Sequence, residues 1–115
     1  MEAILISPDE NMRRDIVLGN KIVTIRRGFR NYTPGPTMLC CHIVPWAVMV
    51  DVVMVRHKLI RHLSKPEIEH DGFKDMDDLL NGLKKFYSDI DEDSPVTVVW
   101  WENVRGTLVD EAKNG

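Results

Sequence analysis

Two consecutive apolar runs in the middle of the chain constrain its fold more than any other feature. The runs "TMLCCHIV" (37–44) and "WAVMVDVVMV" (46–55) are rich in β-branched residues and are separated near Pro45. Apolar runs of this length, bounded by a turn residue, are typical of largely buried strands. Asp51 interrupts the second run, which indicates a bulge, a polar partner or a sheet edge at that point. We therefore expect two neighbouring strands at the centre of a β-rich core.

Helix-capping signals occur on both sides of these strands. Ser7, Pro8 and Glu10 fit the N-cap, N1 and N3 positions of a capping box, and Gly19 with Asn20 can end that helix in the left-handed conformation. The same signals predict a short helix in 64–70, capped by Ser64 with Glu67, and a further helix that Asp75 and Asp78 open and that runs through Tyr87.

Shorter β-type segments complete the pattern. We expect strands at 3–6, 21–26 and 96–104, and a loop at 27–36, which contains two Gly and two Pro. The resulting order, β-α-β-β-β-α-α-β, predicts an α+β fold: a mixed, partly closed β-barrel of five to six strands with flanking helices. At this length we expect one domain (1–115), with a core at about 4–105 and a tail at 106–115.

Composition narrows the class of protein. The chain has 115 residues, of which 43% are hydrophobic and 29% are charged, as in ordinary globular domains. No apolar run approaches the roughly 20 residues of a membrane span, and no secretion signal is visible, so we expect a cytoplasmic protein without a membrane partner. Cys40 and Cys41 are adjacent, which disfavours a disulfide between them.

Charge is unevenly distributed along the chain. The first 65 residues contain ten Lys and Arg against five Asp and Glu, whereas the last 50 contain five against thirteen. A basic first half can face phosphates, and an acidic second half can keep the surface solvated. With a net charge of −3, extensive binding of duplex DNA is not expected.

Several familiar sites are absent from the sequence. It contains no GxGxxG, GxxxxGK[ST], GxSxG or HExxH motif. The four histidines, at 42, 57, 62 and 70, lack the regular spacing of metal ligands. We therefore predict neither a metal nor a cofactor.

The segment "LGNKIVTIRRG" (18–28) offers the most reactive chemistry in the chain. Strand alternation places Thr24 and Arg26 on one face and Val23 and Ile25 on the other. Lys21 has the wrong parity to join Thr24 in a regular strand. It can do so only from the turn after Gly19-Asn20 or beside a bulge.

A Thr hydroxyl needs an adjacent base to act as a nucleophile. A Lys amine can serve once burial or nearby cations lower its pKa, and the candidate cations are Arg26, Arg27 and Arg30. The competing interpretation is an ordinary strand edge, where Thr, Lys and Arg are common residues.

These residues also carry a family resemblance. The strings "GNKIVTIR", "PG" before a strand, "HDGF" before a helix that ends in "FY", and "VTVVWWENV" together resemble the ASCH domain. The resemblance covers about residues 4–105, and its most specific part is G-x-K-x-x-T-I-R followed about 45 residues later by the (D/E)-G-F turn. It implies a PUA-like β-barrel in a family broadly associated with RNA binding.

One branch of short, single-domain ASCH proteins hydrolyses N4-acetylcytidine. Resemblance to that branch implies Lys21 as the activating base, Thr24 as the nucleophile and Asp71 as the acidic catalytic residue. The family has Glu at the last position, so the Asp71 carboxylate is displaced by up to about 1.5 Å. Glu67 or Glu69 is an alternative acid. Arg26 is expected to hold the pyrimidine O2 or the developing oxyanion.

Two other interpretations stay open at this stage. In a non-catalytic RNA-binding module, Lys21, Arg26, Arg27 and Arg30 contact phosphates, and Tyr32 or Trp46 stacks on a base. In a related version, the same basic groove cuts single-stranded RNA. The expected partner is thus a pyrimidine nucleoside or single-stranded RNA, and the oligomeric state is left open.

Overall fold

The computed structural model describes residues 2–6, 9–41 and 43–109 of the chain. Its elements, in chain order, are β1 (Glu2–Leu5), α1 (Glu10–Leu18), β2 (Val23–Arg27), β3 (Gly35–Cys40), β4 (Trp46–Leu59), the 3₁₀ turn η1 (Ile60–His62), α2 (Lys65–His70), α3 (Met76–Lys84) and β5 (Pro95–Val109).

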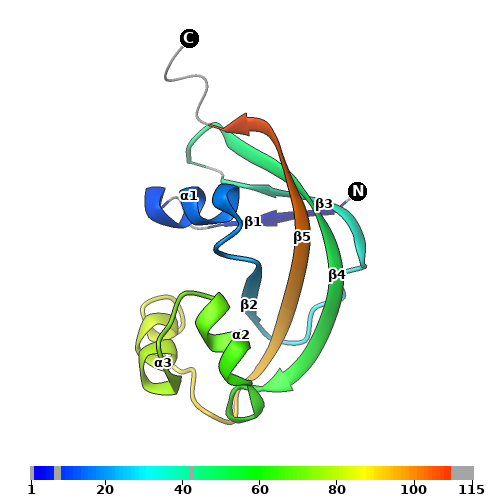
Figure 1. The fold of residues 1–115 in the computed structure, drawn as a ribbon. Helices are drawn as coiled ribbons and strands as arrows, with labels where there is room; N and C mark the ends of the chain where they lie inside the picture. Colours follow the sequence, from blue (N-terminus) through cyan, green and yellow to red (C-terminus); the bar gives the residue numbers. More distant parts are fainter. Residues whose placement is uncertain (1, 7–8, 42, 110–115) are drawn as a thin grey trace.

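Five strands form one mixed sheet in the order β1-β3-β4-β5-β2. The β1–β3 pair is parallel and the other three pairs are antiparallel. β4 and β5 are 14 and 15 residues long, and they bend together into an arc with the helices on its concave side (Figure 1). Three register shifts between these two strands produce local bends of this kind. The predicted α+β, partly closed barrel is confirmed, with five strands in the described residues.

The apolar side chains form two clusters along this curved sheet. One contains Ile16 of α1 together with Leu39, Val48 and Trp101 of the strands. The other lies beneath α2 and α3 and contains Ile68, Leu79 and Leu83 with Val23 and Val98. One cluster packs under α1 and the other under α2 and α3, and a cavity lies between these two parts of the molecule.

The helix ends match the expected chemistry at most positions. Asp75 caps α3 through the Asp78 N–H, and at α2 the Ser64 side chain and Glu67 form the complete predicted capping box. For α1 the N-cap is Asp9, whose carboxylate accepts from the Met12 N–H at 3.0 Å. The expected caps Ser7 and Pro8 lie outside the described residues.

Strand and helix ends differ from the expected ones where long-range pairing decides them. β3 ends at Cys40 rather than at residue 44, and α3 ends at Lys84 rather than at Tyr87. β5 continues to Val109, because its pairing with β4 extends to the Trp46–Val109 pair. Residues 106–109 therefore belong to the strand and not to a tail, and residues 110–115 lie outside the described chain.

Asp51 marks both a bulge and a polar partner. It follows a register shift between β4 and β5, and its carboxylate accepts from Arg105 and from the Asn103 side chain, each at 2.9 Å. These bonds lower the pKa of Asp51, first through the Asn103 amide and then through the Arg105 guanidinium.

The structure also bears on membrane-spanning helices and on clusters of metal ligands. Within 2–6, 9–41 and 43–109, no helix is long and apolar enough to cross a membrane, and no three potential ligand side chains gather as a metal site. Among the described residues, neither Cys40 nor Cys41 forms a disulfide.

The capping box of α2 is expected to contribute measurably to stability. Burial alone would raise the pKa of Glu67, but hydrogen bonds from Lys58 and Ser64 hold that pKa below its usual value. Ser64→Ala removes the bond to the Glu67 N–H, and we expect the free energy of unfolding to fall by about 1 kcal/mol. Urea denaturation measures this change, with exposed Ser88→Ala as the control; equal stabilities of the two variants would contradict the assignment.

Gly82 offers a second test of packing. A Cβ atom at this position of α3 would overlap Cε1 of the Phe73 ring. Although Gly→Ala normally stabilises a helix interior by about 1 kcal/mol, Gly82→Ala must push the aromatic ring aside. We expect a loss of about 1–3 kcal/mol in the free energy of unfolding. Asn81→Ala, on the exposed side of the same helix, is the control. A gain in the free energy of unfolding of Gly82→Ala equal to that of the control would show that Phe73 moves aside at no cost.

Candidate active site

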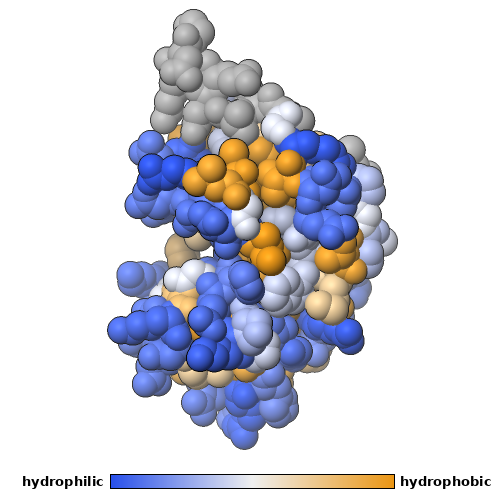
Figure 2. Space-filling model, in the orientation of Figure 1, coloured by the Kyte–Doolittle hydropathy of each residue, from blue (hydrophilic) through white to orange (hydrophobic). Residues whose placement is uncertain are grey.

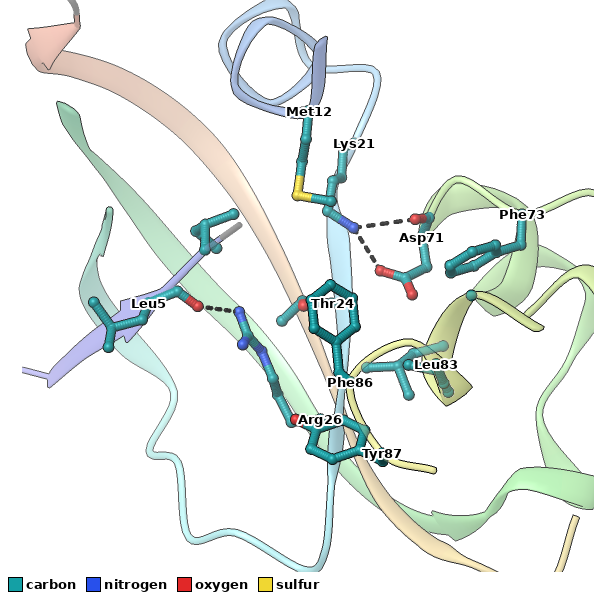
Figure 3. Close-up of a pocket in the computed structure, with 13 residues that line it drawn as sticks. Leu5, Met12, Lys21, Thr24, Arg26, Asp71, Phe73, Leu83, Phe86 and Tyr87 are labelled. Atoms are coloured by element: carbon teal, nitrogen blue, oxygen red, sulfur yellow. Dashed lines mark hydrogen bonds and ion pairs between the residues drawn. The ribbon is translucent and has the colours of Figure 1, made fainter. Parts of the chain in front are cut away.

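A cavity of about 310 Å³ occupies the space between α1 and the α2–α3 segment. Figure 2 shows the surface hollowed at this position, and Figure 3 shows the residues that line it. The polar lining consists of Lys21, Thr24, Arg26 and Asp71, and the remaining walls are apolar: Leu5, Ile6, Met12, Ile25, Phe73, Gly82, Leu83, Phe86 and Tyr87. Cavities of this size that are mainly apolar and contain a few polar groups are typical of small-ligand sites.

Lys21 enters the cavity from the turn that precedes β2. Gly19 ends α1 with φ 81°, and the Lys21 N–H donates to the Asp15 carbonyl at 3.1 Å. The strand begins only at Val23, so the alternation of β2 does not govern Lys21. This position is one of the two that the sequence pattern allowed for Lys21 to join Thr24.

Asp71 meets Lys21 inside the cavity. The Lys21 Nζ lies 2.5 Å from Asp71 Oδ1 and 3.2 Å from the Asp71 carbonyl oxygen, and both side chains are less than a tenth exposed. Asp71 is the C-cap of α2, and Gly72 follows with φ 102°. Asp71 therefore reaches Lys21, although its side chain is one methylene shorter than that of Glu.

Burial sets the protonation of this pair. Removal from water raises the pKa of Asp71 above its usual value, and the Lys21 ammonium and the Arg26 guanidinium oppose the shift without cancelling it. The Asp71 carboxyl therefore keeps a proton to higher pH than an exposed aspartate does. A carboxyl of this kind is suited to proton transfer.

Thr24 lies on the same wall as this pair. It is the second residue of β2, pairs with Val99 of β5, and is 6% exposed. In the part of the chain that the structure describes, its hydroxyl has no hydrogen-bond partner, and it faces the cavity (Figure 3). The hydroxyl is thus available to a ligand.

Arg26 follows two residues later on the same face of β2. One terminal nitrogen donates to the Leu5 carbonyl, whereas Nε is buried and has no partner among the described residues. Burial lowers the pKa of Arg26 from its very high ordinary value, while Tyr32, Tyr87 and Asp71 oppose that shift. The guanidinium remains a cation at neutral pH.

The other predicted ligand-binding residues do not line the cavity. Arg27 points to the opposite side of β2, where it pairs with Asp89 at 2.7 Å and lies 5.4 Å from the Tyr87 ring centroid. Arg30 is exposed and donates to the Tyr32 hydroxyl at 3.4 Å, and Tyr32 packs half-buried against the core. The structure therefore does not bring these residues to Lys21 and Thr24.

Trp46 corrects a specific expectation. It is only 2% exposed, because strand alternation places it in the core with Val48 and Val50. In this position its ring has no face free to stack on a base. The alternative acids also lie elsewhere: Glu67 pairs with Lys58 at 2.7 Å, and Glu69 lines a neighbouring hollow rather than the cavity.

Sequence reasoning missed most of the apolar lining. The sequence predicts a helix that runs through Tyr87, but α3 ends before Phe86 and Tyr87, and Phe86 is 73% exposed. Phe73 belongs to the "HDGF" string and forms the wall beside Asp71. The strings "HDGF" and "FY" were thus the available signals, although their spacing alone does not place the rings.

The arrangement can support acyl transfer. It combines a free hydroxyl, a buried amine–carboxyl pair that can exchange a proton, and a cation beside them. The described residues contain no cluster of metal-ligating side chains that would suggest a different reaction. The roles of Lys21, Thr24 and Asp71 stay predictions.

Comparison with known proteins supports the fold. No protein-family description and no curated protein sequence matches the chain. Among solved structures, a serine-to-alanine variant of ZmASCH from Zymomonas mobilis superposes with a TM-score of 0.65 at 14% sequence identity, over 97% of this chain and 76% of that one. A tyrosine-to-phenylalanine variant of the same protein gives a TM-score of 0.64 at 14% identity, over 97% and 78%. The chain therefore has the fold of an ASCH domain.

Proposed function

We propose that this protein is an amidohydrolase of the ASCH type that removes the acyl group from N4-acetylcytidine. The observation that carries the proposal is the meeting of Lys21, Thr24 and Asp71 in one cavity, although Asp71 is 50 residues from Lys21 in the chain. The resemblance to the short amidohydrolase branch of the family supplies the identity of the substrate.

The buried pair provides the base. Transfer of one proton from Lys21 Nζ to Asp71 Oδ1 leaves a neutral amine beside a carboxylic acid, and burial, which raises the pKa of Asp71, makes its carboxylate a better proton acceptor than an exposed aspartate. The amine then takes the proton of the Thr24 hydroxyl as its oxygen attacks the acetyl carbonyl carbon. In this proposal Arg26 donates to the pyrimidine ring carbonyl and so orients the substrate toward Thr24.

The leaving group departs with the second proton. As the bond between the acetyl carbon and N4 breaks, Asp71 protonates the nitrogen and cytidine is released, with the acetyl group on Thr24. Water next attacks this ester, gives one proton to the Asp71 carboxylate, and displaces the Thr24 oxygen, which recovers its proton from Lys21. Acetic acid leaves and both residues return to their starting forms.

The charges around the cavity favour a neutral nucleoside over an RNA strand. Arg27 is already paired with Asp89, so it is not a free cation for phosphates. The hollow beside the Lys21–Asp71 pair carries the carboxylates of Asp9, Asp15 and Glu69 in its lining. Such a wall repels a polyanion but tolerates an uncharged ligand.

Replacement of the nucleophile gives the first test. We expect the parent protein to release cytidine from N4-acetylcytidine, and Thr24→Ala to lose at least a hundredfold in kcat because no oxygen remains to attack. Thr24→Ser keeps a hydroxyl and should keep part of the activity. Chromatographic separation of the two nucleosides measures turnover. A folded parent that releases no cytidine would sink the proposal, and loss of activity by serine equal to that by alanine would contradict the role of Thr24.

Replacement of the acid gives the second test. Asp71→Asn keeps the size of the side chain but removes the proton that Asp71 exchanges, so we expect kcat to fall by a factor on the order of 10²–10⁴. Glu67→Gln is a matched control, because this buried carboxylate pairs with Lys58 outside the cavity. Circular dichroism checks that both variants are folded. Equal rates for Asp71→Asn and the parent would remove Asp71 from the mechanism.

A further inference from the structure

The opening of the cavity carries two exposed apolar side chains. Leu5 of β1 is 53% exposed and Phe86, just beyond α3, is 73% exposed, and both line the cavity. Figure 3 shows Leu5 at the left and Phe86 at the centre, with the Arg26 side chain between them. Water contact with large apolar groups is unfavourable. Two such groups at one opening therefore indicate a surface that a ligand covers.

The backbone holds Phe86 at this opening. The Phe86 and Tyr87 N–H groups both donate to the Leu83 carbonyl, at 3.0 and 2.9 Å, in the turn that ends α3. Tyr87 is half-buried against the core below α3, whereas the Phe86 ring lies 6.5 Å from the Tyr87 ring, tilted by 56°. The Phe86 ring is thus positioned without being packed.

Arg26 supplies a cationic hydrogen-bond donor to the same cavity wall. Its terminal nitrogen is bound to the Leu5 carbonyl, which fixes the guanidinium in the cavity wall. Its buried Nε has no acceptor among the described residues. Arg26 also lines the cavity, so its remaining guanidinium N–H groups can donate to a carbonyl oxygen that a ligand brings here.

From these observations we propose that Leu5 and Phe86 form a clamp that holds a flat heterocycle bearing a ring carbonyl, with the carbonyl directed to Arg26. This deepens the proposed function, on which it rests for the reaction: the substrates are amides of aromatic ring amines, and not of open-chain amines. An aromatic face on Phe86 and a thin aliphatic edge on Leu5 suit a single planar ring.

Cytidine binding tests the clamp without any turnover. Isothermal titration calorimetry measures the affinity for cytidine. It is applied to the parent and to three variants: Phe86→Ala, Phe86→Leu and Phe86→Tyr. We expect alanine and leucine to weaken binding roughly tenfold, and tyrosine to bind within about threefold of the parent, because only an aromatic face can stack. Leu5→Ala should weaken binding by a smaller factor while its carbonyl still holds Arg26.

Phe29→Ala is the matched control, because Phe29 is 58% exposed but does not line the cavity. It should bind cytidine as the parent does. Phe86→Leu binding as tightly as the parent would overturn the clamp, as would a folded parent that binds no cytidine.

The clamp and the proposed hydrolysis can fail separately. Cytidine binding that depends on an aromatic residue at position 86, without turnover of N4-acetylcytidine, would support the clamp and refute the amidohydrolase. Turnover with an unchanged KM in both Phe86→Ala and Leu5→Ala would overturn the clamp and leave the amidohydrolase standing. A raised KM at nearly constant kcat in these two variants would support both.

Discussion

The buried contact between Lys21 and Asp71 is the interaction on which the candidate site depends. It joins the turn between α1 and β2 to the C-terminal end of α2, 50 residues later in the chain. Both side chains are less than a tenth exposed, so the contact holds two buried ionisable groups against each other. Burial raises the pKa of the Asp71 carboxyl at this contact, and the proposed mechanism moves one proton across it.

The shape of the sheet makes room for that contact. β4 and β5 are long enough to carry one apolar cluster under α1 and a second under α2 and α3. The cavity lies between these clusters, so its walls come from both of them.

Much of this could be predicted from local pattern. The Ser64–Glu67 capping box, the turn at Gly19 and the common face of Thr24 and Arg26 follow from rules that act over a few residues. Trp46 and Phe86 could not be placed in this way. An aromatic residue in an apolar run packs inside or outside according to which neighbour covers it, and for these two the neighbours are distant in the chain.

The sequence by itself determined the class of fold and the chemical groups on offer: β-branched runs specify strands, capping residues specify helix ends, and alternation aligns Thr24 with Arg26. Only the tertiary structure decided that Asp71 reaches Lys21, that Arg27 turns away to Asp89, and that Phe86 stands at the opening of the cavity. The physical reason is one of range. Propensity and capping act within a few residues, whereas ion pairing and burial depend on how the bent sheet folds distant segments together.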